Sequence, residues 1–288
     1  MTSLDTSESA APPARLMAIL AHPDDESLGM GGTLARYAAE GIETFLVTAT
    51  RSERGWFGEP SANPGLEALG RIREAELRHA VAALGIRRVD FLNYVDGALD
   101  QADPREAILR IVAHVRRERP QVVLTFGPDG AYGHPDHIAI SQLATAALVA
   151  AADASYPDRL EGQPPHRVAK LYYKIWTAAE DALFEEVFGD SVMQIDGVER
   201  RAFGWPEWAI TTRIDTADHW RACWEAVSCH RSQLPGYGEL LNLGEARHRA
   251  LWGAQGFLRA YSLVNVARAL ERDLFEGLDV IRPQAVGT

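Results

Sequence analysis

The stretch Leu16-Met17-Ala18-Ile19-Leu20-Ala21-His22-Pro23-Asp24-Asp25-Glu26 decides the fold of this chain. Its first five residues form a short apolar run that ends in a proline-containing turn, which is typical of a buried strand. Gly31-Gly32-Thr33 then opens an alanine-rich helix predicted over residues 34–40. Acids and an imidazole therefore lie on the loop at the carboxyl end of a strand, where open α/β sheets place their ligands.

A second stretch, Gly133-His134-Pro135-Asp136-His137, has the same setting far downstream. A strand is predicted before it over residues 122–126, followed by a turn over residues 127–130. A helix is predicted after it over residues 138–152. If the two strands are central neighbours, the two loops converge on one crevice.

The side chains of these loops are those that bind a catalytic divalent metal. Two neutral imidazoles and a carboxylate make a three-ligand site that leaves a fourth position for water, as in catalytic zinc sites. His22, Asp25 and His137 can supply that set. Asp24 and Asp136 then remain as supporting or proton-transfer groups, and His134 as a donor to developing charge.

A plainer interpretation of either motif alone is an acidic, proline-containing helix cap that faces solvent. Two such motifs occur together, and each stands between a predicted strand and a predicted helix. This repetition favours the metal site over the caps.

Composition limits the class of protein. The chain has 288 residues, enough for one large α/β domain or one domain with an appended lobe, and its hydrophobic content of 47% is ordinary for a globular protein. The net charge of −11 argues against nucleic-acid or anionic-membrane partners, which need a basic surface. No apolar run approaches the roughly 20 residues of a membrane span.

The two cysteines, Cys223 and Cys229, fall on different faces of one predicted helix, so a disulfide between them is not expected. They form no metal motif either, and a reducing cytoplasm fits best. Residues 1–13 lack a signal-peptide pattern and are predicted to be a loose tail. Residues 14–288 are predicted to form a single domain, with residues 14–152 as the metal-site core and 153–288 as an extension that completes the substrate pocket.

The other elements follow the same alternation. Strands are predicted over residues 44–48, 89–92, 170–176 and 209–214, and helices over residues 71–84, 104–119, 182–188, 217–229 and most of 246–270. Residues 56–70 are predicted to be a long loop. The pattern predicts a doubly wound, mostly parallel, Rossmann-like α/β sheet with a C-terminal α/β extension. The first strand is not followed by G-x-G-x-x-G, so dinucleotide binding is not supported.

The two motifs resemble those of the LmbE-like, or PIG-L, family of zinc-dependent N-deacetylases. The resemblance extends from Arg15 to about Ala150, with a weaker match at His230-Arg231-Ser232-Gln233. It is strongest to the bacterial branch that includes the mycothiol-pathway deacetylase and amidase and the bacillithiol-pathway deacetylase.

The resemblance implies a role for each site residue. Asp24 would be the general base, and Tyr132 would approach the same substrate oxygen as His134. Asp136 would orient the ring of His134 or stabilise its charged form. Glu53, Arg73 and Asp96 would contact the sugar. Ser52 stands where the family usually has glycine, which puts the shape of that loop in question.

The sequence thus predicts a cytoplasmic hydrolase that uses Zn²⁺, or Fe²⁺ in the cell, to remove an N-acetyl or other N-acyl group from an amino sugar or its conjugate. One alternative is an amidase that cleaves a larger acyl conjugate, such as a mycothiol S-conjugate. Another is a non-catalytic metal- or sugar-binding module, which would have no need of Asp24 beside its metal. The oligomeric state stays open, a homo-oligomer included.

Overall fold

The computed structural model describes residues 11–157, 162–189, 192–195, 197–202, 204–265 and 269–282. Its centre is a seven-stranded sheet with the strand order β3-β2-β1-β4-β5-β9-β8. β1 to β5 pair in parallel, whereas β9 is antiparallel to both β5 and β8. The strands are β1 (Arg15–Leu20), β2 (Glu43–Thr48), β3 (Arg88–Phe91), β4 (Val122–Phe126), β5 (Lys170–Lys174), β8 (Thr212–Asp215) and β9 (Ala254–Ser262). The predicted fold class is confirmed.

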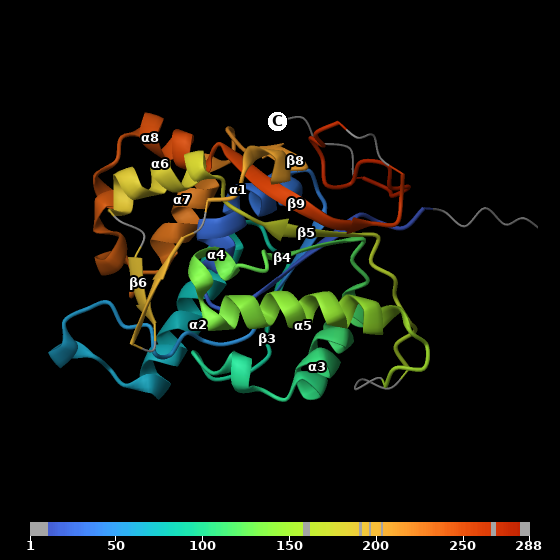
Figure 1. The fold of residues 1–288 in the computed structure, drawn as a ribbon, viewed down its shortest axis with the longest axis horizontal. Coiled ribbons are helices and arrows are strands. Elements are labelled where there is room, and N and C mark those ends of the chain that lie inside the picture. Colours follow the sequence, from blue (N-terminus) through green and yellow to red (C-terminus); the bar gives the residue numbers. More distant parts are fainter. Residues whose placement is uncertain are drawn as a thin grey trace, which may run out of the picture.

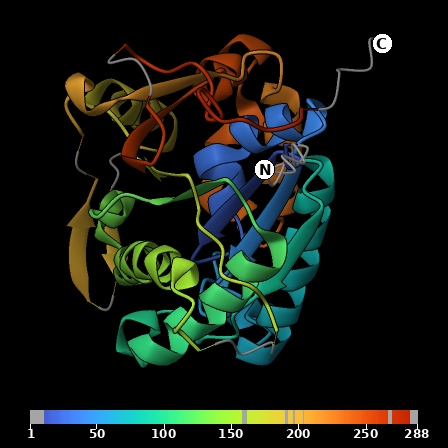
Figure 2. The same cartoon turned by 90° about the vertical axis from the view of Figure 1, so that its right-hand side faces the viewer.

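Helices cover both faces of this sheet (Figures 1 and 2). α1, α2 and α7 pack together on one face, and α3 packs against α5 on the other. The larger helices are α1 (Asp25–Ala39), α2 (Leu66–Ala83), α3 (Pro104–Glu118), α5 (Pro135–Ala152), α6 (Ala178–Phe188), α7 (Trp220–Cys229) and α8 (Glu245–Trp252). Among the residues that the structure describes, no helix is both long and apolar enough to span a membrane.

The strand order reverses between β1 and β4. From β1 the chain winds outward through β2 to β3, then returns to β4 and continues to β5. All of β4 is buried, as is β1 after its first residue, as expected for parallel strands covered on both faces. The loops that leave β1 and β4 therefore flank the switch point of the sheet, and these loops carry the two motifs.

Two smaller elements stand beside the second motif. α4 (Gly130–Gly133) precedes it, with non-helical angles at Ala131 and Tyr132. A separate hairpin of β6 (Val192–Ile195) and β7 (Val198–Arg201) contacts α4.

The prediction of helix through most of residues 246–270 is wrong. α8 ends at Trp252, and after Gly253 the chain becomes β9. The helix-favouring residues of this segment are overridden by pairing, since β9 lies between β5 and β8 and fills the sheet.

Several boundaries also differ. α1 begins at Asp25 rather than near Leu34, with a kink at Met30, where φ is −149°. α2 begins at Leu66, so the predicted loop over residues 56–70 is shorter. Residues 1–10 of the predicted tail lie outside the described residues. Its last part is anchored, because Pro13 pairs with Ile281 in an isolated bridge.

Candidate metal centre

The structure brings His22, Asp25 and His137 together at the carboxyl ends of β1 and β4. Nδ1 of His22 lies 3.1 Å from Nε2 of His137. Oδ1 of Asp25 lies 3.3 Å from that same Nε2, and Oδ2 lies 3.8 Å from Nδ1 of His22. All three side chains are buried.

These separations fit a metal ion. Two donors that each bind one tetrahedral zinc at 2.0–2.1 Å lie about 3.3 Å apart. Oδ2 of Asp25 also accepts hydrogen bonds from the backbone N–H groups of Ala21 and His22, at 3.1 and 2.7 Å. The carboxylate is thus held in place, with Oδ1 facing the imidazole of His137.

The other ring nitrogen of His22, Nε2, contacts two further carboxylates. This nitrogen lies 3.1 Å from Oδ2 of Asp136 and 3.1 Å from Oδ1 of Asp96. Burial works to lower the pKa of His22, but hydrogen bonds to Asp136 and Asp96 outweigh it and raise this pKa well above its ordinary value. Because Nε2 donates to these acids, Nδ1 is the nitrogen available to a metal.

The positions of Asp136 and Asp96 differ from the roles expected of them. The Asp136 carboxylate contacts His22 rather than His134, and it also accepts from the backbone N–H groups of Gly97 and Leu99, at 2.7 and 3.0 Å. The buried Asp96, expected at the sugar, contacts the same imidazole. The sequence could not show this, because the direction of each carboxylate depends on how the loop after β3 folds over the site.

Asp24 lies beside this cluster in a strained backbone conformation, with φ of 98°. Its Oδ2 accepts from Nη2 of Arg73 at 3.1 Å and from the hydroxyl of Tyr237 at 3.0 Å. Burial raises the pKa of Asp24 above its ordinary value, although Arg73 opposes the shift. A carboxylate with a raised pKa beside a metal centre is suited to general-base chemistry.

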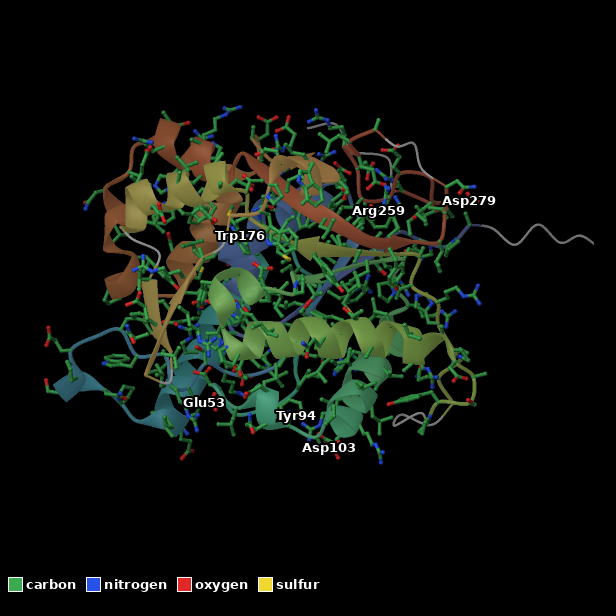
Figure 3. The ribbon with its side chains drawn as sticks, in the orientation of Figure 1. Glu53, Tyr94, Asp103, Trp176, Arg259 and Asp279 are labelled. Atoms are coloured by element: carbon green, nitrogen blue, oxygen red, sulfur yellow. The ribbon has the colours of Figure 1, made fainter. Side chains whose placement is uncertain are left out.

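The two other residues expected at the sugar differ in exposure. Arg73 is fully buried behind Asp24 and also donates to the carbonyl of Pro23. Glu53 is partly exposed on the loop after β2, at the left of the view in Figure 3, and its Oε1 accepts from the backbone N–H of Asp96 at 3.1 Å.

His134 has its tautomer fixed by the backbone. Its Nδ1 accepts from the N–H of Asp136 at 3.1 Å, so the neutral ring carries its proton on Nε2. Burial and the nearby His22 and His137 lower the pKa of His134 to about 3, which keeps the ring neutral. One nitrogen of His134 also lies within 4.8 Å of nitrogens of His22 and His137, but His134 could bind a metal with them only by giving up its hydrogen bond from Asp136 or the proton on Nε2.

Tyr132 places its ring against the two imidazoles of the second motif. The ring centroid lies 5.9 Å from that of His134 and 5.4 Å from that of His137. Burial, with the charges of Asp25 and other carboxylates, raises the pKa of the phenol well above its ordinary value, so it remains a hydrogen-bond donor.

Two further features hold Asp24 in place and were not predicted from the sequence: the Glu26–His230 pair and Tyr237. Glu26 and His230 form a fully buried pair, with Oε1 of Glu26 2.8 Å from Nε2 of His230. Oε2 of Glu26 accepts from the N–H of Asp24 at 3.0 Å, so this pair supports the Asp24 turn. Tyr237 contacts Asp24 directly, through the hydrogen bond to Oδ2. The motif at residues 230–233 was the only signal that this part of the chain reaches the site.

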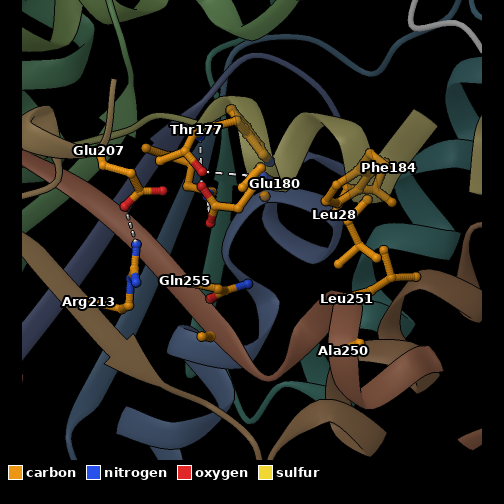
Figure 4. Close-up of a pocket in the computed structure, with 15 residues that line it drawn as sticks. Leu28, Thr177, Glu180, Phe184, Glu207, Arg213, Ala250, Leu251 and Gln255 are labelled. Atoms are coloured by element: carbon orange, nitrogen blue, oxygen red, sulfur yellow. Dashed lines mark hydrogen bonds and ion pairs between the residues drawn. The ribbon is translucent and has the colours of Figure 1, made fainter. Parts of the chain in front are cut away.

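A separate cavity of about 240 Å³ lies among α1, α6, α8 and β9 (Figure 4). Leu28, Phe184 and Leu251 form its apolar wall, whereas Arg213 and Glu207 pair with each other at 2.9 Å on another side. None of the proposed metal ligands lines it.

Known proteins are similar to this chain in sequence and in fold. Residues 17–148 match the family model described as PIG-L, GlcNAc-PI de-N-acetylase. The chain is 38% identical over 251 residues to a 1D-myo-inositol 2-acetamido-2-deoxy-alpha-D-glucopyranoside deacetylase of Rhodococcus jostii, covering 76% of this chain and 82% of that protein. It is 35% identical, over an alignment of 309 positions, to the corresponding deacetylase 2 of Catenulispora acidiphila. That alignment covers 94% of this chain and 99% of that protein.

The crystal structure of the conserved protein TT1542 from Thermus thermophilus has the same fold. Its TM-score to this chain is 0.60 at 29% identity, over 87% of this chain and 96% of that one. The chain therefore belongs to the PIG-L, or LmbE-like, family of deacetylases, as its two motifs predict.

Proposed function

We propose that this deacetylase removes the acetyl group from an N-acetylglucosamine joined to inositol, or from a closely related conjugate, with Zn²⁺ held by His22, Asp25 and His137. The substrate is inferred from relatives named for it, one of which is similar over nearly the whole chain. The observation that carries the chemistry is a buried carboxylate outside the proposed ligand set, Asp24, which precedes the proposed ligand Asp25 and is held by Arg73 and Tyr237.

When bound in such a site, zinc lowers the pKa of a water ligand to about 7 and polarises a carbonyl group. Asp24 takes a proton from the attacking water through Oδ1, because Oδ2 is already occupied by Arg73 and Tyr237. The same carboxyl group then gives the proton to the leaving amine. The acetyl group leaves as acetate and the sugar keeps a free amine.

His134 and Tyr132 stabilise the charge that develops on the carbonyl oxygen. The neutral ring of His134 donates through Nε2–H, since its Nδ1 is occupied by a backbone N–H. The phenol of Tyr132 lies against that ring and keeps its proton.

Glu53 is our candidate for a sugar hydroxyl, because it is partly exposed and only its Oε1 has a described partner. Arg73 and Asp96 instead act through Asp24 and His22. A cavity of about 480 Å³, lined in part by Arg200 and by Pro135 and Ile138, which flank the second motif, is our candidate for the rest of the conjugate, although none of the proposed metal ligands lines it. Nε of Arg200 is buried and has no described acceptor, so a hydroxyl or anionic group of the substrate would satisfy it.

Residues 153–288 are part of this proposal as an extension that completes the site, because they supply His230 and Tyr237. We also propose a reducing cytoplasmic location, since both Cys223 and Cys229 are free thiols.

The function is tested by combining metal analysis of the pure protein with mass spectrometry of a panel of N-acyl amino sugars. The expected result is about one divalent ion per chain, as the three-ligand site requires, with free amine and acetate released from inositol-linked N-acetylglucosamine. Preferential release of a larger acyl group would support the amidase instead. Binding of these sugars without any release would show a non-catalytic module.

A further inference from the structure

One oxygen of Asp24 accepts hydrogen bonds from two residues that are far apart in the sequence. Arg73 on α2 and Tyr237 in the 3₁₀ segment Leu234–Asn242 both donate to Oδ2, at 3.1 and 3.0 Å. No described residue donates to Oδ1. Hydrogen bonds to a carboxylate are stronger than those between neutral groups. The two donors therefore fix Oδ2 and leave Oδ1 for chemistry.

The segment that carries Tyr237 is anchored just before it. Both the backbone N–H and the hydroxyl of Ser232 donate to the carboxylate of Glu76, at 2.7 Å each. The side-chain amide of Gln233 donates to the carbonyl of Gly55 at 2.8 Å. These bonds join the segment to α2 and to the loop after β2, so its position relative to Asp24 is set by the fold.

The backbone of the segment then turns the phenol toward Asp24. Tyr237 has non-helical angles, with φ of −116° and ψ of 24°, inside the 3₁₀ helix. Its ring centroid lies 6.4 Å from that of Phe57. A Cβ at Gly236 would lie 2.8 Å from the Phe57 ring, so this close packing depends on glycine.

We propose that Tyr237 is a positioning residue of the deacetylase reaction, whose hydroxyl holds Oδ2 of Asp24 so that Oδ1 faces the attacking water. Arg73 alone would hold the carboxylate from one side and allow it to rotate. The second donor removes this rotation and keeps the base in a reactive orientation. The inference rests on the proposed role of Asp24 as the base.

The test is Tyr237→Phe, which removes the hydroxyl and keeps the ring against Phe57. We expect kcat to fall about 10-fold with KM and metal content unchanged, because the interaction orients the base and does not bind substrate. In an Asp24→Asn background the same change should alter the residual rate by less than about twofold, since coupled residues are not additive.

Tyr173→Phe is the matched control. Tyr173 lies in β5, and the change removes its phenol hydroxyl, which lies 2.8 Å from Oγ1 of Thr145 in α5. Its kcat should equal that of the wild type.

The outcomes separate this inference from the proposed function. Wild-type kcat in Tyr237→Phe, together with an Asp24→Asn variant slowed by about 10²–10⁴, would contradict the inference alone. A change confined to KM would make Tyr237 a substrate contact, and a full additive loss in the double variant would remove the coupling to Asp24. An active Asp24→Asn would overturn the proposed function itself.

Discussion

Asp136 precedes the proposed ligand His137 in the sequence, but its carboxylate supports the other proposed imidazole ligand, with Oδ2 3.1 Å from Nε2 of His22. The two motifs are thereby interlocked, because each contributes an imidazole and the second also fixes the orientation of the first. In our proposal this contact makes Asp136 a support of the ligand His22 and not itself a ligand.

We therefore expect Asp136→Asn to weaken metal binding by about 10–100-fold, the usual effect of losing the partner of a ligating imidazole. Competition with a chelator measures the affinity. Asp100→Asn, an exposed change nearby, is the control and should leave the affinity unchanged. Wild-type affinity in Asp136→Asn would show that Asp96 alone suffices to orient His22.

Replacing either proposed imidazole ligand should abolish metal binding. His22→Ala and His137→Ala each leave two of the three proposed ligands, and both variants should lose the metal together with activity. Metal analysis of the purified variants provides the test. Full occupancy in both of them would be incompatible with this ligand set.

His134 separates two interpretations of the imidazole cluster. If its Nε2–H stabilises the carbonyl oxygen, His134→Ala should keep the metal and lower kcat by roughly 10²–10³, as for other oxyanion donors. Steady-state rates and metal content are measured on the same preparation. Loss of the metal would instead make His134 a ligand, and an unchanged kcat would remove it from the mechanism.

The Glu26–His230 pair should matter for stability, because both side chains are fully buried. Removing one partner of a buried pair typically lowers the free energy of unfolding by about 3–5 kcal/mol. We expect His230→Ala to show a loss of this size in chemical denaturation, whereas His219→Ala, a less buried change near the start of the same helix, should be close to neutral. Equal stabilities would mean that Glu26 finds another partner.

The sequence was sufficient to predict the strands and loops that carry the two motifs. β1 and β4 are short apolar runs with polar loops after them, so both strands and the convergence of their loops could be predicted. The nature of the side chains on those loops then indicated a metal site. Local propensity failed at β9, whose strand conformation comes from its neighbours β5 and β8.

The sequence was insufficient where a contact depends on side-chain direction across distant segments. Nothing in the local pattern shows that Asp96 and Asp136 face His22, or that Tyr237 reaches Asp24. The resemblance placed Arg73 at the sugar, and its complete burial behind Asp24 emerges only from the packing of α2.

The central claim is that Asp24 acts as a base and not as a ligand. Its pKa is raised by burial, so kcat/KM of the wild type should fall as the pH decreases, beginning above the ordinary aspartate value of about 3.9. The most direct measurement is the pH dependence of kcat/KM for Asp24→Asn, with its metal content determined in parallel. The account predicts full metal content, a rate lower by about 10²–10⁴ and the loss of the acidic limb. A variant that loses its metal, or that keeps the wild-type rate and profile, would contradict it.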